Sequence, residues 1–461
     1  MSIGRIEGSG CGTMEIGRSR DRISELPDAI LHHIFSFLPT RQLVEASILS
    51  KRWAHLWEST PTLSFSSDDF DSTMDGRRRF TNFIDTVLLL RDASDISTVR
   101  LRWTGEGKDL EQADRWLRFV VKRNVKRLEL QMHLYIDEIL PSCIFNCQSL
   151  QVLKLEVMCG FIGLPGPVSL PKLKRLEVSY AEFLDDDSLK DLLSGCPLLQ
   201  VLSFEHCYFT SLEICSPELK SLELYVPDDA DTTIRISAPK LLSLTYWGMV
   251  FQELTLMNLS SLTYASVCLF FNSLNDDIED TDRCRRISNV LTGLHNVESL
   301  EFLSGAFKFL LQMRDRSQSL PLFRNLKHLR AGISLDKDGI TGITSLLQCS
   351  PNLEFLVIDQ YKVPQNLCVE GGSIATMPDS TRLCHLRVVE INNFGATEHE
   401  LSFVKLLSGN IFSAEKVALV PSKKTENQVM MHADGSSSTT IQHEEIQGLL
   451  TSSSLPHAGL Q

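Results

Sequence analysis

Residues 21–65 have the sequence DRISELPDAILHHIFSFLPTRQLVEASILSKRWAHLWESTPTLSF. Apolar residues recur in it at spacings of three and four, which is typical of helices with an apolar face. Pro27 suits the opening turn of a first helix, and Pro39 ends that helix and begins a second. Ser50 is placed to cap a third helix, which Pro61 ends. The stretch therefore predicts three short helices.

This helical unit carries more apolar surface than so small a unit can bury. A unit of about 45 residues hides only a modest part of its surface and is marginally stable alone. Nevertheless it contains four large aromatic residues, namely Phe35, Phe37, Trp53 and Trp57. Two interpretations remain open from the pattern. Either the surplus apolar area is a partner surface, or the unit caps a larger domain and buries every aromatic side chain internally.

An ordered set of short motifs in this unit resembles the F-box of plant F-box proteins. The matching residues are Asp21-Arg22-Ile23, Leu26-Pro27, Leu31, Ile34, Phe37-Leu38-Pro39, Leu49-Ser50-Lys51-Arg52-Trp53 and Leu56-Trp57. The resemblance implies that the unit binds a Skp-type adaptor, which links F-box proteins to a cullin-based ubiquitin ligase. The adaptor contacts that it implies are Leu26, Pro27, Ile30, Leu31, Ile34, Leu38, Pro39, Leu49, Ser50, Trp53, Leu56 and Trp57.

A repeated unit dominates the chain from residue 125 onward. It is an apolar residue, two variable positions, leucine, one variable position and a second apolar residue, as in Val125-Leu128-Leu130. The regular units begin at residues 125, 150, 173, 199, 219 and 241. They are 20 to 26 residues apart, which is the spacing of leucine-rich repeats. Less regular units begin at residues 297, 326, 353 and 386.

The repeat predicts the fold class. Both apolar residues of the Leu-x-Leu part point to one face of a short strand, and stacking the units buries them in one core. Residues 187–193 are predicted to return along the convex side as a helix, whereas the returns at 215–217 and 238–239 are too short for one. We predict an α+β or α/β solenoid, in which a small three-helix F-box precedes an irregular leucine-rich-repeat solenoid.

The variable positions of the strands face solvent along the concave side of such a fold. They are candidates for binding a target protein, and their mixed charge favours a protein over a nucleic acid. These candidates are Lys126, Arg127, Glu129, Lys154, Glu156, Arg175, Glu177, Ser203, Glu205, Ser221, Glu223 and Thr245.

The end of the chain resembles a second segment of plant F-box proteins, the one called FBD. The resemblance lies in residues 386–407, including the turn Asn393-Phe394-Gly395 and Glu400-Leu401. We expect this segment and a last strand at 416–420 to cap the open end of the repeats. The polar, serine-rich residues that follow predict disorder. The predicted organisation is a flexible leader 1–20, an F-box 21–65, a linker 66–79, a leucine-rich-repeat domain 80–383, an FBD-like cap 384–420 and a disordered tail 421–461.

The composition argues against several other classes of protein. The 461 residues carry a net charge of −13, so a broad basic surface for nucleic acid or anionic membranes is not expected. No run approaches the roughly 20 apolar residues that span a bilayer. The first twenty residues lack the apolar core of a secretory signal, and the 12 cysteines are therefore expected to be free thiols. We expect a protein of the cytosol, the nucleus or both.

No metal site, cofactor site or catalytic constellation is predicted. His32 and His33 are adjacent on a helix and point in different directions. Cys143 and Cys147 are more typical of buried thiols than of ligands. Residues 105–108, GEGK, lack the spacing and the Ser or Thr of a phosphate-binding loop.

These observations, with the resemblance, predict a non-enzymatic subunit that recognises substrates for a Skp–cullin–F-box ubiquitin ligase. Its partners would be the Skp-type adaptor, a cullin scaffold through that adaptor, and a target protein that the sequence does not identify. Two alternatives remain open. One is a scaffold or inhibitor without ligase function, and the other is a small-molecule sensor with several Arg or Lys converging on the concave face.

Overall fold

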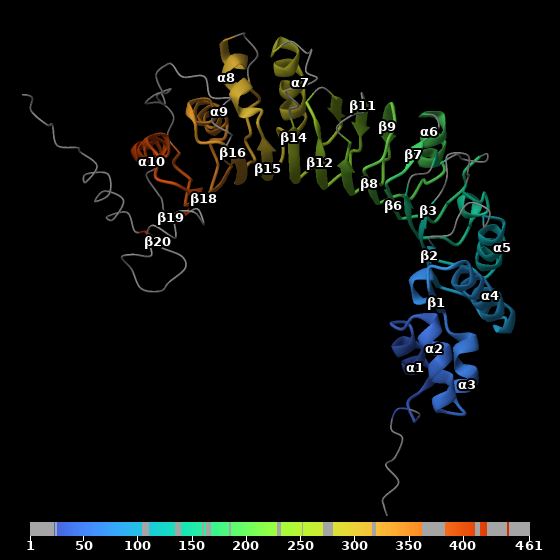
Figure 1. Cartoon of the computed structure of the whole chain (residues 1–461). Coiled ribbons are helices and arrows are strands. Elements are labelled where there is room, and N and C mark those ends of the chain that lie inside the picture. Colours follow the sequence, from blue (N-terminus) through green and yellow to red (C-terminus); the bar gives the residue numbers. More distant parts are fainter. Residues whose placement is uncertain are drawn as a thin grey trace, which may run out of the picture.

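The computed structural model describes residues 23, 25–103, 110–133, 140–158, 161–162, 167–183, 186–227, 232–250, 252–270, 280–315, 320–361, 383–410, 415–421 and 440–441. Among them, fifteen strands form one sheet that bends into an arc (Figure 1). Neighbouring strands are parallel throughout, except for the last pair. The helices that connect the strands lie on the outer, convex side of the arc, so the inner, concave side is left to the strands, and the N-terminal helices lie at one end of the arc.

The N-terminal unit is helical, as predicted. It contains α1 (Asp28–Phe35), α2 (Thr40–Ala46) and α3 (Trp53–Leu56), with the 3-10 turns η1 (Ser47–Leu49) and η2 (Trp57–Ser59). Prolines precede α1 and α2, where a missing N–H is harmless because the first amides of a helix have no partner within it. The buried apolar side chains of the unit are Leu31, Phe35, Leu43, Leu56 and Trp57.

The strands of the large sheet follow the repeat. They are β1 (Thr62–Ser66), β2 (Thr98–Trp103), β3 (Arg127–His133), β4 (Val152–Met158), β6 (Arg175–Ser179), β8 (Val201–Glu205), β10 (Ser221–Tyr225), β12 (Ser243–Met249), β14 (Tyr264–Phe270), β15 (Ser299–Ser304), β16 (His328–Ile333), β17 (Phe355–Gln360), β18 (Val388–Phe394), β19 (Lys416–Pro421) and β20 (Thr440–Ile441). The first leucines of successive repeats pair in register and are fully buried, for example Leu153, Leu176 and Leu202. This stacking makes one core from units that could not bury their apolar faces alone.

Helices and short strands return the chain along the convex side. The helices are α4 (Met74–Leu90), α5 (Leu110–Val121), α6 (Asp186–Ser194), α7 (Asp280–Gly293), α8 (Phe307–Asp315), α9 (Lys337–Gln348) and α10 (Glu398–Asn410). The helix predicted at 187–193 is confirmed as α6. Where the return is shorter, strands replace the helix. They are β5 (Phe161–Ile162) with β7 (Glu182–Phe183), and the three-stranded sheet of β9 (Ser211–Cys215), β11 (Thr233–Ser237) and β13 (Glu253–Met257).

The boundary between the helical unit and the sheet differs from the prediction. The first strand, β1, lies inside the range predicted for the F-box, because Leu63 and Phe65 alternate with polar residues and are buried against the sheet core. The predicted linker 66–79 is also wrong, since its residues already belong to the repeat domain. They form the 3-10 turn η3 (Ser67–Asp69) and the start of α4, where the Thr73 hydroxyl accepts a hydrogen bond from the amide of Gly76 at 3.1 Å.

The C-terminal part of the sheet includes α10 and β19, so the strand predicted at 416–420 is present, and β20 lies beyond it in the strand order. The carboxylate of Glu400, which is fully buried, accepts hydrogen bonds from the amides of Gly395 and Thr397 at 2.9 and 2.8 Å. The Thr397 hydroxyl accepts in turn from the amide of Glu400 at 3.3 Å, which completes a capping box. This explains why a Glu follows the turn at this spacing.

The predicted leader and most of the predicted tail lie outside the described residues. The prediction of disorder is wrong at Thr440–Ile441, which pair with β19 as an antiparallel strand. Among the helices of the described ranges, none has the length and apolar character needed to cross a bilayer.

Candidate partner-binding surfaces

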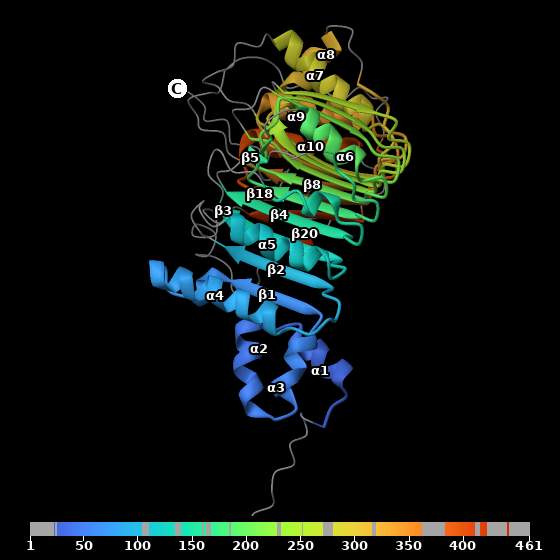
Figure 2. The same ribbon diagram turned by 90° about the vertical axis from the view of Figure 1, so that its right-hand side faces the viewer.

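The helical unit covers the edge of the large sheet. Strand β1 is the first strand, and its outward amide at Ser64 donates a hydrogen bond to the Thr40 hydroxyl of α2 at 2.7 Å. Behind it, the buried Arg91 guanidinium donates to the carbonyl of Thr60 at 2.7 Å. An uncovered edge strand would offer unpaired backbone groups to other chains, so α2 acts as the cap of the sheet. Figure 2 shows the helical unit lying directly against β1.

A different face of the helical unit is apolar and exposed. Helix α1 buries Leu31 and Phe35 in the unit, yet Ile30 and Ile34 on its other side are 46% and 40% exposed. This side continues into Phe37, which is 75% exposed. An ordinary surface helix would carry polar residues there, because one apolar stripe is enough to hold it on its core.

The turn η1 also carries exposed apolar side chains. Its side chains Ile48 and Leu49 are 87% and 77% exposed. Together with Ile30, Ile34 and Phe37 they form what we call the α1–η1 face. The unit does cap the sheet, but the exposed Phe37 contradicts the interpretation in which every aromatic side chain is buried internally, and the surplus apolar area favours a partner surface.

The predicted adaptor contacts fall into three groups. Exposed residues are Pro27, Ile30, Ile34 and Leu49. Half-buried residues are Leu26, Leu38, Pro39, Ser50 and Trp53. The remaining three, Leu31, Leu56 and Trp57, are buried in the core of the unit, and the prediction that they contact a partner directly is wrong. Their helical spacing places these apolar residues on a face of a helix, but it does not show whether that face packs in the core or is exposed to a partner.

Sequence reasoning left three exposed apolar residues out of the contact set. They are Ile23, Phe37 and Ile48. Phe37 stands three residues after Ile34, so the spacing of Ile30, Ile34 and Phe37 was a usable signal for a second apolar face. Ile48 lies in a 3-10 turn and carries no such signal.

The predicted target-binding residues lie on the concave side with one exception. Eleven of them occupy strand positions that alternate with buried apolar residues, namely Arg127, Glu129, Lys154, Glu156, Arg175, Glu177, Ser203, Glu205, Ser221, Glu223 and Thr245. Lys126 instead precedes β3, in the turn where its amide donates to the carbonyl of Ser97 at 3.0 Å. The prediction of Lys126 as a strand position on the concave side is therefore wrong.

Glu129 and Glu177, on the first strands of the concave side, are each paired with basic side chains. Glu129 lies 3.3 Å from the Arg100 guanidinium, and Glu177 lies 3.4 Å from the Lys154 ammonium and 2.8 Å from Arg175. Partial burial acts to raise the pKa of Glu177, but the hydrogen bond from Arg175 and the charge of Lys154 hold that pKa below its usual value. We call this region, on β2 to β6, the paired ladder.

The paired ladder bears on the predicted small-molecule alternative. That alternative requires Arg and Lys side chains free to converge on an anionic ligand. Here Lys154 and Arg175 are both bound to the same glutamate, Glu177, so neither is available without breaking an existing pair. The geometry therefore does not favour an anion-binding pocket at these strands.

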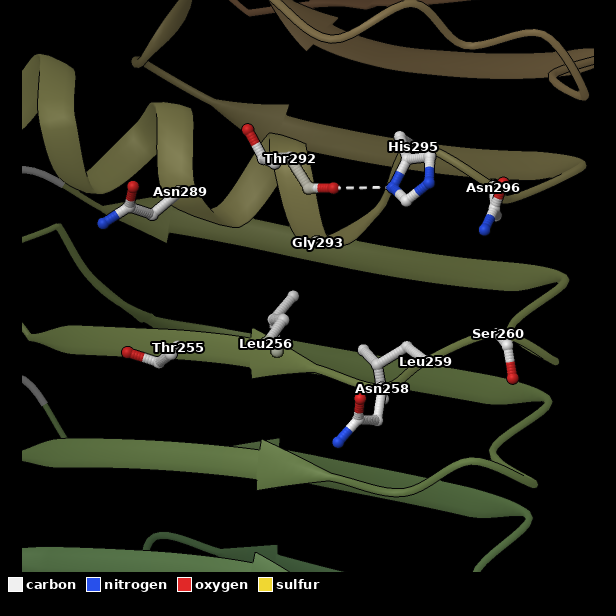
Figure 3. Close-up of a pocket in the computed structure, with 10 residues that line it drawn as sticks. All are labelled: Thr255, Leu256, Asn258, Leu259, Ser260, Asn289, Thr292, Gly293, His295 and Asn296. Carbon is white, nitrogen blue, oxygen red and sulfur yellow. Dashed lines mark hydrogen bonds between the residues drawn. The ribbon is translucent and has the colours of Figure 1, made fainter.

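A cavity of about 520 Å³ lies on the convex side, between β13 and the end of α7 (Figure 3). Its lining combines Leu256 and Leu259 with amide, hydroxyl and imidazole groups, and it contains no Asp, Glu, Lys or Arg. The ring nitrogen Nδ1 of His295 lies 2.8 Å from the carbonyl oxygen of Thr292. We assign no chemistry to this cavity, because none of its side chains pairs with another in a nucleophilic or acid–base arrangement.

Metal binding finds no support among the described residues, which contain no cluster of three His, Cys, Asp or Glu side chains suited to an ion. His32 lies 3.2 Å from the Ser59 hydroxyl, whereas His33 packs edge-on against Phe37 with ring centroids 5.1 Å apart. Burial raises the pKa of the Cys143 thiol to about 11, which disfavours the thiolate that a metal would need.

Comparison with known proteins places the helical unit and the sheet in one family. The family described as "F-box domain" matches residues 23–64, and "FBD-associated F-box protein At5g56370, LRR repeats" matches residues 113–267. The chain is 32% identical over 383 residues to "Putative F-box protein At1g58310" of Arabidopsis thaliana, covering 75% of this chain and 74% of that protein. This chain belongs to the plant F-box/FBD/leucine-rich-repeat family.

Other relatives from Arabidopsis thaliana extend the match over nearly the whole chain. "F-box/FBD/LRR-repeat protein At1g78750" is 28% identical over 435 residues, which are 90% of this chain and 93% of the relative. "F-box/LRR-repeat protein At4g14103" is 30% identical over 358 residues, which are 75% and 93% of the two chains. The α1–η1 face thus lies on the F-box, and the paired ladder lies on the leucine-rich repeats.

Proposed function

We propose that this protein is the substrate-recognition subunit of a Skp–cullin–F-box ubiquitin ligase. The F-box docks on a Skp-type adaptor, which connects it to the cullin scaffold, and the leucine-rich repeats form a solenoid that holds a target protein. The FBD-like segment closes the far end of that solenoid. The role requires no catalytic residue in this chain, and it belongs in the cytosol or the nucleus.

The observation that carries the proposal is the exposed α1–η1 face. Large apolar side chains left exposed in number on a soluble protein mark binding sites, and Ile30, Ile34, Phe37, Ile48 and Leu49 are all exposed on the F-box. Side chains at the centre of such an interface commonly cost about 2 kcal/mol or more when truncated. The proposal therefore assigns adaptor contact to Pro27, Ile30, Ile34, Phe37, Ile48 and Leu49, with Leu26, Leu38, Pro39, Ser50 and Trp53 at its border.

The contribution of this chain to ubiquitin transfer would come from where it holds the target protein. A ligase subunit accelerates ubiquitin transfer by holding the target near the conjugating enzyme, and proximity of this kind lowers the barrier without chemistry from the scaffold. The concave side of the repeats, which none of the described helices covers, is the surface available for the target.

The test is binding of the full chain to a purified Skp-type adaptor, measured by calorimetry. Ile34→Asp places a charge in the α1–η1 face, and Leu322→Asp is the matched control, because Leu322 is 46% exposed in a distant repeat and Ile34 is 40% exposed. We expect the adaptor to bind Ile34→Asp at least about thirtyfold more weakly than the wild type, and Leu322→Asp unchanged.

Two outcomes would contradict the proposal. Equal affinity for Ile34→Asp and the wild type would exclude the α1–η1 face, and no adaptor binding by the wild type would exclude adaptor docking altogether. Circular dichroism of both variants shows whether the fold is retained. Adaptor binding without ubiquitination of any bound protein would instead favour the scaffold or inhibitor alternative.

A further inference from the structure

The middle of the concave side carries a row of aromatic side chains. Tyr225 on β10, Trp247 on β12 and Phe270 on β14 all occupy positions that face away from the leucine core. Their ring centroids follow one another at 5.8 and 5.9 Å. The side chains of Trp247 and Phe270 are 37% and 41% exposed, so neither ring is part of the buried core. Exposed aromatic rings at the centre of a concave surface are the kind of anchor that dominates binding energy.

The carboxylates next to this row differ from those of the paired ladder. The neighbours of Glu223 in register are Ser203 and Thr245, and those of Glu205 are Ser179 and Tyr225. None of these neighbours carries a positive charge, so the ladder of ion pairs stops here. The only hydrogen bond to the Glu205 carboxylate among the described residues is from the Ser179 hydroxyl, at 3.3 Å.

The negative charges of both carboxylates act on Tyr225 of the aromatic row. The pKa of the Tyr225 phenol is raised by its partial burial and further by the negative charges of Glu223 and Glu205. No basic side chain forms an ion pair with Glu223 or Glu205 within the part of the chain that the structure describes. Two carboxylates without counter-ions beside exposed aromatic faces make a local surface that is both negative and apolar.

We propose that Glu205, Glu223, Tyr225, Trp247 and Phe270 form a binding site for a segment of a target protein that presents an arginine beside an apolar residue. A cation over the face of Trp or Tyr gains attraction from the ring, and a carboxylate at the same place adds a charge-assisted hydrogen bond. Arginine suits the site better than lysine, because its planar group can stack on a ring while its N–H groups reach the carboxylates. The neighbouring apolar residue would pack on Phe270.

This inference deepens the proposed function by naming the chemistry of the target, and it rests on that function only for what happens after binding. The occupant is another protein rather than nucleic acid, since phosphates would meet Glu205 and Glu223 without a counter-ion. The paired ladder offers no equivalent site, because Glu129 and Glu177 already hold Arg and Lys side chains of this chain. Its other glutamate, Glu156, accepts a hydrogen bond from the Gln131 side-chain amide at 2.8 Å and has Gln131 and Ser179, not aromatic residues, as register neighbours.

The test uses the full chain and two panels of fluorescein-labelled nine-residue peptides, measured by fluorescence polarisation. Both panels have random flanks around a fixed leucine. In one panel arginine follows the leucine, and in the other citrulline, its uncharged isostere, takes that place. We expect the arginine panel to bind at least about tenfold more tightly, and the difference to shrink as salt is raised.

Variants assign the binding to this site. Glu205→Gln with Glu223→Gln should abolish the preference for arginine, and Trp247→Ala should weaken both panels by about tenfold. Glu129→Gln is the matched control, because this glutamate faces the same side but is paired, and the preference should survive. The adaptor must bind every variant as it binds the wild type, which separates failure of this inference from failure of the F-box.

Equal binding of the two panels would overturn the inference. So would loss of the preference in Glu129→Gln to the same extent as in the double variant, because the effect would then be one of overall charge.

Discussion

Replacing Glu400 by alanine should open the C-terminal end of the sheet. The wild-type carboxylate is fully buried and accepts from the amides of Gly395 and Thr397, which would lose their partner inside the protein. Hydrogen bonds to a charged acceptor contribute about 1.5 kcal/mol or more each, so the two amides together give about 3 kcal/mol. This corresponds to a population of the opened end about 150-fold higher.

The loss should be local, because each repeat contacts only its neighbours and terminal units open independently of the middle. Hydrogen exchange read by mass spectrometry can resolve this, since β18 and β19 should exchange about 100-fold faster in Glu400→Ala while β3 and β4 serve as the internal reference. Glu398→Ala is the control, because Glu398 is an exposed carboxylate on the same helix turn. Exchange of β18 and β19 at the wild-type rate would refute the structural role of Glu400, and equal acceleration in Glu398→Ala would refute its dependence on burial.

Two further predictions concern the core. A Cβ at Gly342 would lie 2.1 Å from the Phe307 carbonyl oxygen, so Gly342→Ala should force α8 and α9 apart and cost about 1–3 kcal/mol, whereas Gly409→Ala, with open space around it, should be neutral or stabilising in thermal unfolding. Burial raises the pKa of the Cys207 thiol from 9.0 to about 12. Because the pKa of this thiol is higher in the folded than in the unfolded protein, the free energy of unfolding decreases as pH rises above 9. Chemical denaturation between pH 9 and 12 should therefore show a smaller decrease in Cys207→Ala than in the wild type. An equal loss in both proteins would contradict this.

The repeat architecture could be predicted from the sequence because two independent regularities agree. Alternation within each strand places both leucines on one face, and the spacing of 20 to 26 residues brings the next strand beside it. The paired leucines of β4 and β6 show both regularities at once. The convex strands β9, β11 and β13 were not predicted, since five residues with one or two buried apolar side chains are too short a signal without their neighbours.

The binding surfaces were less predictable, because each depends on contacts between residues distant in sequence. Helix α1 is apolar on two faces, and only the packing of the other helices decides that Leu31 is buried while Ile34 is exposed. Likewise, Glu177 and Glu223 occupy the same position of the repeat. The first has Lys154 beside it and the second has Ser203, which becomes visible only when the register of the strands is known.

The hydrogen-bonded joint between the F-box and β1 has a consequence for reach. No flexible tether separates the two parts, so under the proposed function the number of intervening strands sets the distance from the adaptor to the target. Six steps along the sheet order lead from β1 to β10, and at about 4.8 Å each they span roughly 29 Å. A duplicated or deleted repeat would shift the target by one such step and turn it by the curvature of the arc. The geometry of ubiquitin delivery in such a protein would thus change in discrete increments.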